Sequence, residues 1–139
     1  MPIQQSEVLY TAVATAENGR DGRVATDDGK LDVVVNPPKE MGGNGAGTNP
    51  EQLFAAGYSA CFQGALGVVA RQEGADITGS TVTAKVGIGK NDDGFGITVE
   101  ISAAIPSVDA ATARSLVEKA HQVCPYSKAT RGNITVTLV

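Results

Sequence analysis

The residues with the most evident chemistry are two cysteines, Cys61 and Cys124, and one histidine, His121. A thiol can serve as a nucleophile, a redox centre or a metal ligand, and an imidazole can serve as a base or a ligand. Because the chain holds one histidine, a multi-histidine metal site is excluded, and any histidine-based catalysis must use His121. The two thiols can also be inert, because free cysteine commonly packs as a small buried hydrophobe.

The number of cysteines and the N-terminal sequence indicate the redox compartment. Two cysteines in 139 residues are far from the density of a disulfide-stapled secreted scaffold. Residues 1–8 lack the basic start and the apolar stretch of a signal peptide. We therefore expect a cytoplasmic protein, and in that compartment a disulfide is usually catalytic or redox-sensing.

The composition limits the class of protein and its partners. Hydrophobic residues make up 42% and charged residues 19%, which favours one globular domain over residues 1–139. The formal net charge is −4 and no basic run occurs, so binding to nucleic acid or to an anionic membrane has no electrostatic source.

Strands are expected in the first third of the chain. Residues 8–16, 23–26 and 31–35 are rich in strand-forming residues, and the Asp28-Gly29 pair is typical of a hairpin turn. Residues 37–47 are rich in glycine and are predicted to form a loop. The loop resembles an anion cradle but lacks the lysine and hydroxyl residue of a phosphate-binding P-loop, so a flexible loop is the better interpretation.

A long helix is expected next. Thr48 or Asn49 can cap it, Pro50 suits its first turn, and Glu51 complements its N-terminal dipole. Residues 52–70 carry no charge and are long enough to invite a membrane span, but their glutamines, serine and glycines dilute the hydrophobicity. A soluble helix that is apolar on all sides must be buried on all sides, and one small chain hardly suffices. A homodimer is therefore expected.

The second half of the chain shows clear alternation and one amphipathic face. Its predicted order is strand, strand, helix, strand, with hairpin and cap residues at the junctions. The segments are strands 82–88 and 95–103 joined by Asn91–Gly94, a helix capped by Ser107 or Asp109 and ended by Pro125, and a strand over 134–138. The order β-β-β-α-β-β-α-β with hairpin-linked strands predicts an α+β fold with antiparallel sheet.

The helical positions make the two cysteines chemically unequal. Cys61 is expected in the middle of the uncharged helix and Cys124 at the end of the amphipathic one, where outward carbonyls disfavour an anion. A reactive Cys61 thiolate would need a cation brought from elsewhere. Arg20, in a glycine-flanked turn, is a candidate, and Glu51 could hold it in a bidentate pair. Equally, Arg20 can be a solvated surface residue and Glu51 only a helix-start residue.

His121 leaves two further hypotheses open. It lies three residues before Cys124, so it could activate that thiol in a cysteine–histidine hydrolase. A zinc site formed by Cys61, Cys124 and His121 is also conceivable. Neither arrangement has a motif of supporting spacing, and a histidine near a helix end is commonly structural.

Several segments together carry a recognisable pattern. They are GRDG at 19–22, GTNPEQLFAAGYSACF at 47–62, KVGIG at 85–89, HQVCPYS at 121–127 and ATRGNI at 129–134. With them the chain resembles the organic hydroperoxide resistance proteins, the Ohr branch of the Ohr/OsmC superfamily, over essentially its whole length. The resemblance implies a thiol peroxidase with an OsmC-like fold, in which antiparallel sheets wrap a long central helix in an intertwined homodimer.

The resemblance also implies a role for each candidate residue. Cys61 would be the peroxidatic nucleophile, Cys124 the resolving thiol, Arg20 the group that stabilises the thiolate and polarises the peroxide, and Glu51 the residue that orients Arg20. No bound cofactor or metal is expected. The family's reductant is a dihydrolipoyl group on a lipoylated protein.

Two residues are expected to bind the substrate's alkyl group, and one rival function stays open. Leu53 and Phe62 are interpreted as lining an apolar pocket that favours alkyl and fatty-acid hydroperoxides. The rival function is a redox-insensitive binding module in which both thiols are inert parts of the core.

Overall fold

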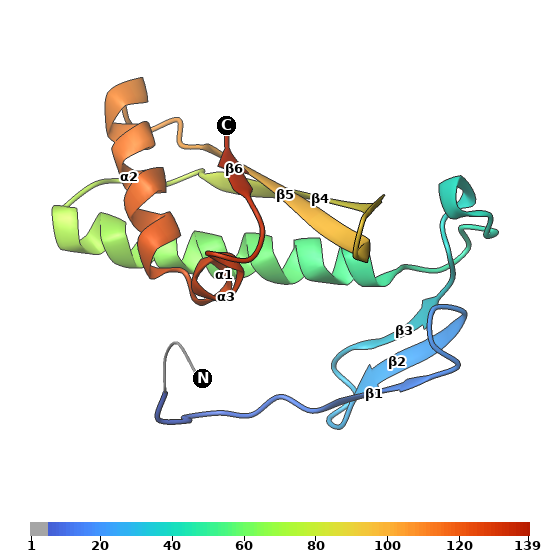
Figure 1. The fold of residues 1–139 in the computed structure, drawn as a ribbon. Helices are drawn as coiled ribbons and strands as arrows, with labels where there is room; N and C mark the ends of the chain where they lie inside the picture. The colour runs from blue at the N-terminus through green and yellow to red at the C-terminus, as the bar shows by residue number, and fades with distance from the viewer. Residues whose placement is uncertain (1–5) are drawn as a thin grey trace. The chain divides into compact units, whose positions relative to one another are not determined.

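A computed structural model describes residues 6–139, which fall into two units that divide after Pro50. Along the chain the elements follow the predicted order, with one short 3-10 helix and one short α-helix added (Figure 1). The α+β class predicted from the sequence is therefore confirmed. The assignment of residues 1–139 to one domain stays a prediction.

The first unit contains a three-stranded antiparallel sheet. Its strands are β1 (Ala14–Glu17), β2 (Gly22–Thr26) and β3 (Asp32–Val35), paired in that order. β1 is shorter than the predicted strand over residues 8–16, because β2 ends at Thr26 and Thr26 pairs with Ala14. In the turn between β1 and β2, Asn18 and Gly19 have left-handed φ angles of 60° and 57°. This turn carries Arg20.

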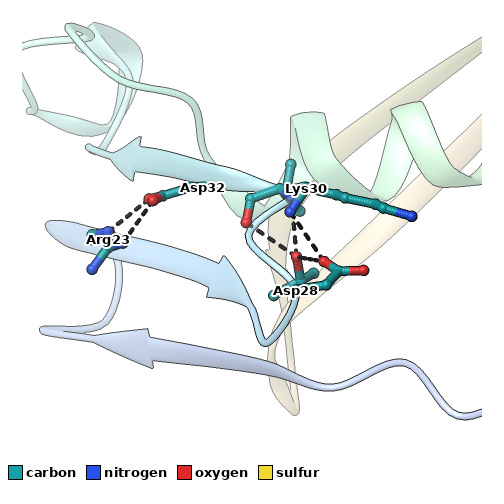
Figure 2. Close-up of polar contacts among 6 residues, drawn as sticks. Arg23, Asp28, Lys30 and Asp32 are labelled. Atoms are coloured by element: carbon teal, nitrogen blue, oxygen red, sulfur yellow. Dashed lines mark hydrogen bonds and ion pairs between the residues drawn. The ribbon is translucent and has the colours of Figure 1, made fainter.

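A side-chain ion pair links β2 to β3. Arg23 donates from Nε and Nη2 to the two carboxylate oxygens of Asp32, each at 2.6 Å (Figure 2). In the connecting turn, Asp28 accepts hydrogen bonds from the Lys30 amide and the Thr26 hydroxyl, which lower the pKa of Asp28. The predicted Asp28-Gly29 hairpin is confirmed. Because these groups are exposed, they fix the hairpin's geometry more than its stability.

The glycine-rich segment forms the predicted loop. It contains one 3-10 turn, η1 (Lys39–Met41), and its end runs beside β3, where the Thr48 amide donates to Val34 O at 2.9 Å. A Cβ at Gly47 would lie 2.5 Å from Val34 O, so only glycine fits this close approach. The end of the loop therefore runs beside β3 and leads directly into the long helix.

The second unit contains the long helix, a sheet and two further helices. The elements are α1 (Pro50–Glu73), β4 (Thr81–Asn91), β5 (Gly94–Ala104), α2 (Ala110–Val123), α3 (Pro125–Thr130) and β6 (Val136–Leu138). The Asp109 side chain caps α2 by accepting from the Thr112 amide at 2.7 Å. β4 and β5 form the predicted antiparallel hairpin, but β6 pairs parallel to β5. The connection through α2 and α3 is a crossover, which returns the chain in the same direction as β5.

The core of the second unit lies between α1, the β4-β5-β6 sheet and α2. α1 runs along the sheet, as Figure 1 shows. The core side chains come from all three parts and are nearly inaccessible to solvent. They include Tyr58, Phe62, Leu66 and Val69 of α1, Val99 and Ile101 of β5, and Leu116 and Ala120 of α2.

The other face of α1 is exposed, and most of its residues between Gln52 and Val68 are small or apolar, which include Ala56, Ala60, Gly64 and Val68. By length and composition α1 could cross a membrane, but its Tyr58 face belongs to the protein core. The prediction that α1 is buried on every side is not met within one chain, because one sheet and one helix can cover only one face of it.

Candidate active site

The two cysteines meet although they are distant in sequence. Cys124 Sγ lies 3.6 Å from Cys61 Sγ, and both residues are free thiols. Cys124 is fully buried and Cys61 is partly accessible. Since a disulfide has an S–S length of about 2.05 Å, a movement of roughly 1.5 Å joins the sulfurs. The pair can therefore form a disulfide with a small local shift.

Cys61 lies in the middle of α1 and Cys124 caps the C-terminus of α2, both as predicted. Cys124 is the junction residue between α2 and α3, with φ −63° and ψ 123°. Its amide donates to Ala120 O and its carbonyl accepts from the Lys128 amide, each at 2.9 Å. Pro125 ends α2, as predicted, and it also starts α3, which the sequence pattern did not predict. Proline at a first helical position is the signal that could have indicated α3.

Opposing effects act on the Cys61 thiol. Burial raises the pKa of Cys61, and so does the neighbouring Cys124 thiol, whereas a hydrogen bond from the Tyr126 backbone amide lowers it. The first effect is the largest, so the net shift of the pKa is upward. Tyr126 lies in the first turn of α3, a donor that the sequence analysis did not identify. A reactive thiolate at Cys61 still requires a positive charge.

His121 is part of a polar network beside the cysteines. Its Nδ1 lies 2.8 Å from Ser127 Oγ, and Ser127 Oγ lies 2.8 Å from Tyr58 Oη. Burial lowers the pKa of His121, and the charge of Arg131 adds to this effect. Within residues 6–139, no group of three histidine, cysteine or acidic side chains is placed to hold a metal ion. The structure therefore gives the zinc hypothesis no support.

An apolar hollow of about 420 Å³ lies next to this network. Tyr126 links the hollow to the cysteines, because its backbone amide reaches Cys61 and the residue lines the hollow. A Cβ at Gly57 would lie 2.8 Å from Tyr126 Oη, so glycine allows the ring to pack directly on α1. The hollow is lined by Phe54, Ile97, Tyr126, Ala129, Thr130, Asn133 and Ile134.

Sequence reasoning did not identify the residues of this hollow. Phe62 is fully buried in the core, where its ring lies 6.5 Å from that of His121. Leu53 is half-buried and does not line the hollow. Phe54, its neighbour on α1, does line it and packs on Tyr126, with ring centroids 6.1 Å apart. Substrate binding by Leu53 and Phe62 stays a prediction.

The two predicted charged residues belong to different units. Arg20 lies in the turn between β1 and β2, and Glu51 lies in the first turn of α1. Their approach to each other and to Cys61 stays a prediction.

Comparisons with known proteins agree on one family. Residues 42–139 match the family model described as OsmC-like protein. An organic hydroperoxide resistance protein of Xanthomonas axonopodis pv. citri is 56% identical over 134 residues, which cover 95% of this chain and 94% of the relative. OhrB of Bacillus subtilis, an organic hydroperoxide resistance protein, is 46% identical over 132 residues, covering 94% of this chain and 96% of that protein.

Solved structures of the same family share the fold. The crystal structure of an organic hydroperoxide resistance protein from Elizabethkingia anophelis is 54% identical to the chain. It superposes with a TM-score of 0.90 and covers 96% of each chain. The likeness therefore extends over both units of the chain.

Proposed function

Because the chain belongs to the OsmC-like family, and within it to the organic hydroperoxide resistance proteins, we propose that it is a thiol peroxidase that reduces organic hydroperoxides to alcohols. The fold is the OsmC-like α+β fold predicted from the sequence. The observation that carries the proposal is the distance of 3.6 Å between the Cys61 and Cys124 sulfurs, one thiol partly accessible and the other buried. That arrangement suits a nucleophile and a resolving thiol.

In the first step, the Cys61 thiolate attacks the terminal oxygen of the hydroperoxide. The O–O bond breaks, Cys61 becomes a sulfenic acid, and the alkoxide takes a proton and leaves as the alcohol. Because burial raises the pKa of Cys61, the step needs a cation at the thiolate. We assign this role to Arg20, which would also polarise the peroxide, and we assign the orientation of Arg20 to Glu51.

In the second step, Cys124 condenses with the sulfenic acid. A sulfur–sulfur bond forms, the sulfur–oxygen bond of Cys61 breaks, and the hydroxide leaves as water with the thiol proton of Cys124. The short distance between the sulfurs allows this step without a large rearrangement. An external dithiol, a dihydrolipoyl group on a lipoylated protein, then reduces the disulfide by thiol–disulfide exchange. The protein itself holds no cofactor or metal in this cycle.

The apolar hollow supports organic hydroperoxides as the substrate class. Phe54, Ile97 and Ile134 offer apolar surface beside the segment that carries Tyr126. An alkyl chain buried there contributes about 25 cal/mol per Å² of apolar area, which hydrogen peroxide cannot gain. Leu53 and Phe62 of α1 would add apolar surface to the site that binds the alkyl chain. Alkyl and fatty-acid hydroperoxides are therefore the proposed substrates, and a response to organic peroxide stress is the proposed role.

A homodimer completes the proposal. The exposed face of α1 is uncharged and built of small residues, which permits close packing with a second α1. Among residues 6–50, Val35 is the one buried hydrophobic side chain, while Leu9, Tyr10 and Val34 are exposed, so this unit needs an apolar surface to cover it. A second copy of the chain would supply a partner for the exposed face of α1 and a cover for the first unit. A monomer in sedimentation velocity would contradict the homodimer. We place the dimer in the cytoplasm, acting without nucleic acid or membrane.

One equivalent of cumene hydroperoxide is expected to lower the mass of the reduced protein by two hydrogens, because the cycle ends in a Cys61–Cys124 disulfide. Intact-protein mass spectrometry measures this. Hydrogen peroxide at the same concentration should give much slower conversion, because it lacks an alkyl group to bury. An unchanged mass with both peroxides would favour the rival function, a binding module with inert thiols.

Replacing Arg20 with alanine is expected to slow Cys61 oxidation by about tenfold or more at neutral pH, because loss of a cation raises the pKa of the thiol. The thiolate reacts, so the rate rises with pH, and in the variant this rise should be displaced to higher pH. Stopped-flow oxidation across a pH series measures it. Arg23→Ala is the matched control, since Arg23 is held by Asp32 in the same unit. Equal profiles for Arg20→Ala and Arg23→Ala would contradict the assignment.

A further inference from the structure

A network of buried hydroxyl groups and one imidazole connects α1, which carries Cys61, to α2 and α3, which flank Cys124. It runs from His121 of α2 through Ser127 of α3 to Tyr58 of α1, and from Tyr58 to Thr130 of α3. Tyr58 and Ser127 are fully buried and Thr130 is nearly so. The peroxidase steps described above use none of these side chains.

The donor of each hydrogen bond in this network can be assigned by starting at Thr130, because each hydroxyl has one proton to donate. Thr130 Oγ1 donates to the Ser127 carbonyl at 3.1 Å, so Tyr58 must donate in its 3.3 Å contact with Thr130. Ser127 must then donate to Tyr58, and His121 Nδ1 must donate to Ser127. The opposite direction would leave one contact without a proton. His121 therefore carries its proton on Nδ1.

The positions of the linked residues relate them directly to the sulfurs. Tyr58 precedes Cys61 by three residues on α1, so both side chains project from neighbouring turns of one face. His121 precedes Cys124 by three residues, and Ser127 follows it by three. The network therefore holds the backbone on both sides of Cys124, and its hydrogen bonds to Tyr58 connect this segment to the turn of α1 next to Cys61. The Arg131 guanidinium adds a bond of 2.6 Å to the His121 carbonyl.

We propose that Tyr58, Ser127 and His121 are positioning residues that hold Cys124 Sγ within reach of Cys61 Sγ. The inference rests on the proposed function for its catalytic meaning. Cys124 has non-helical φ and ψ at a junction between two helices, so its sulfur position depends on how the junction is fastened. A loss of about 1 Å in placement of reacting groups can cost about 100-fold in rate. The network therefore sets the effective concentration of one thiol toward the other.

The test measures the thiol–disulfide equilibrium and needs no hydroperoxide. The full chain is equilibrated with mixtures of reduced and oxidised dithiothreitol, and the Cys61–Cys124 disulfide is quantified after acid quenching and thiol labelling. Tyr58→Phe and Ser127→Ala are expected to lower the equilibrium constant for disulfide formation by about tenfold or more, because each breaks the network. His121→Asn should stay close to wild type, because the asparagine Nδ2 can donate in place of the imidazole Nδ1. His121→Ala should lower the equilibrium constant, because alanine has no group that donates to Ser127.

Controls separate positioning from general stability. Ser59→Ala removes a hydroxyl of α1 that donates to Ala56 O in the same helix and has no part in the network within residues 6–139, so it should leave the equilibrium constant unchanged. Thermal unfolding is followed for every variant. Thr130→Val removes the last and longest side-chain link and should give a smaller decrease in a folded protein.

Several outcomes would overturn the inference. Wild-type equilibrium constants in Tyr58→Phe and Ser127→Ala would do so, as would equal behaviour of His121→Asn and His121→Ala. A fall in unfolding temperature without a change in the equilibrium constant would leave the network a purely structural role. If the variants behave as expected but hydroperoxide does not oxidise the wild type, the proposed function fails and the positioning role stands.

Discussion

Replacing Cys61 with serine is expected to reduce hydroperoxide turnover by about 10³-fold or more, because removal of a covalent nucleophile removes the whole catalysed path. Serine keeps the size and helical position of the side chain. Its hydroxyl is far less acidic than a thiol and cannot pass through a sulfenic acid. The measurement is steady-state reduction of cumene hydroperoxide with a dihydrolipoyl reductant.

The control for this variant lies on the same helix. Ser59→Ala changes α1 two residues away and should turn over like the wild type. Cys61 is only partly buried, so the serine variant should also unfold near the wild-type temperature. Retained turnover in Cys61→Ser would exclude Cys61 as the nucleophile, and a Cys124-based reaction such as the hydrolase hypothesis would then need its own test with His121→Gln.

The sequence predicted the elements whose signals are local. The alternation before Asn91 and after Gly94 predicted β4 and β5, because a half-buried strand repeats every second residue. Ser107 or Asp109 was predicted to cap α2, and Asp109 is the residue whose side chain caps the helix, by accepting from the Thr112 amide. α3 was missed because it spans only six residues, and Pro125 was interpreted as a stop when it is also a start.

The sequence could not predict contacts that depend on packing between distant elements. Nothing local in Cys61 or Cys124 fixes their sulfur separation, which results from how α1 packs against the α2–α3 junction. Residues such as Phe54 and Ile134 form one hollow because α1 and the segment before β6 meet there. His121 was ambiguous for the same reason, since its partner Ser127 lies on α3, and Tyr58, the next residue of the network, lies on α1. The direction of β6 followed from a crossover that the strand pattern does not reveal.

Replacing Cys124 with serine is expected to leave the first oxidation intact and to remove the disulfide cycle. Cys61 should consume one equivalent of hydroperoxide at a rate near that of the wild type, and the product should retain one added oxygen as sulfenic acid. Steady-state turnover should fall by about 100-fold, because the reductant must attack the sulfenic acid in a bimolecular step without a thiol already in place. Single-turnover mass spectrometry and the steady-state assay measure the two effects separately.

The burial of the two thiols decides the order of their roles. Cys124 is fully buried, so a hydroperoxide reaches Cys61 first, and Cys124 can react only with a group already on Cys61. Excess hydroperoxide should therefore convert the Cys124→Ser protein to the irreversible sulfinic acid, whereas the wild type forms its disulfide before that oxidation. Cys124→Ala, which adds no hydroxyl to the core, should give the same result. A normal disulfide cycle in either variant would require a thiol from another chain, and the pairing within one chain would then be wrong.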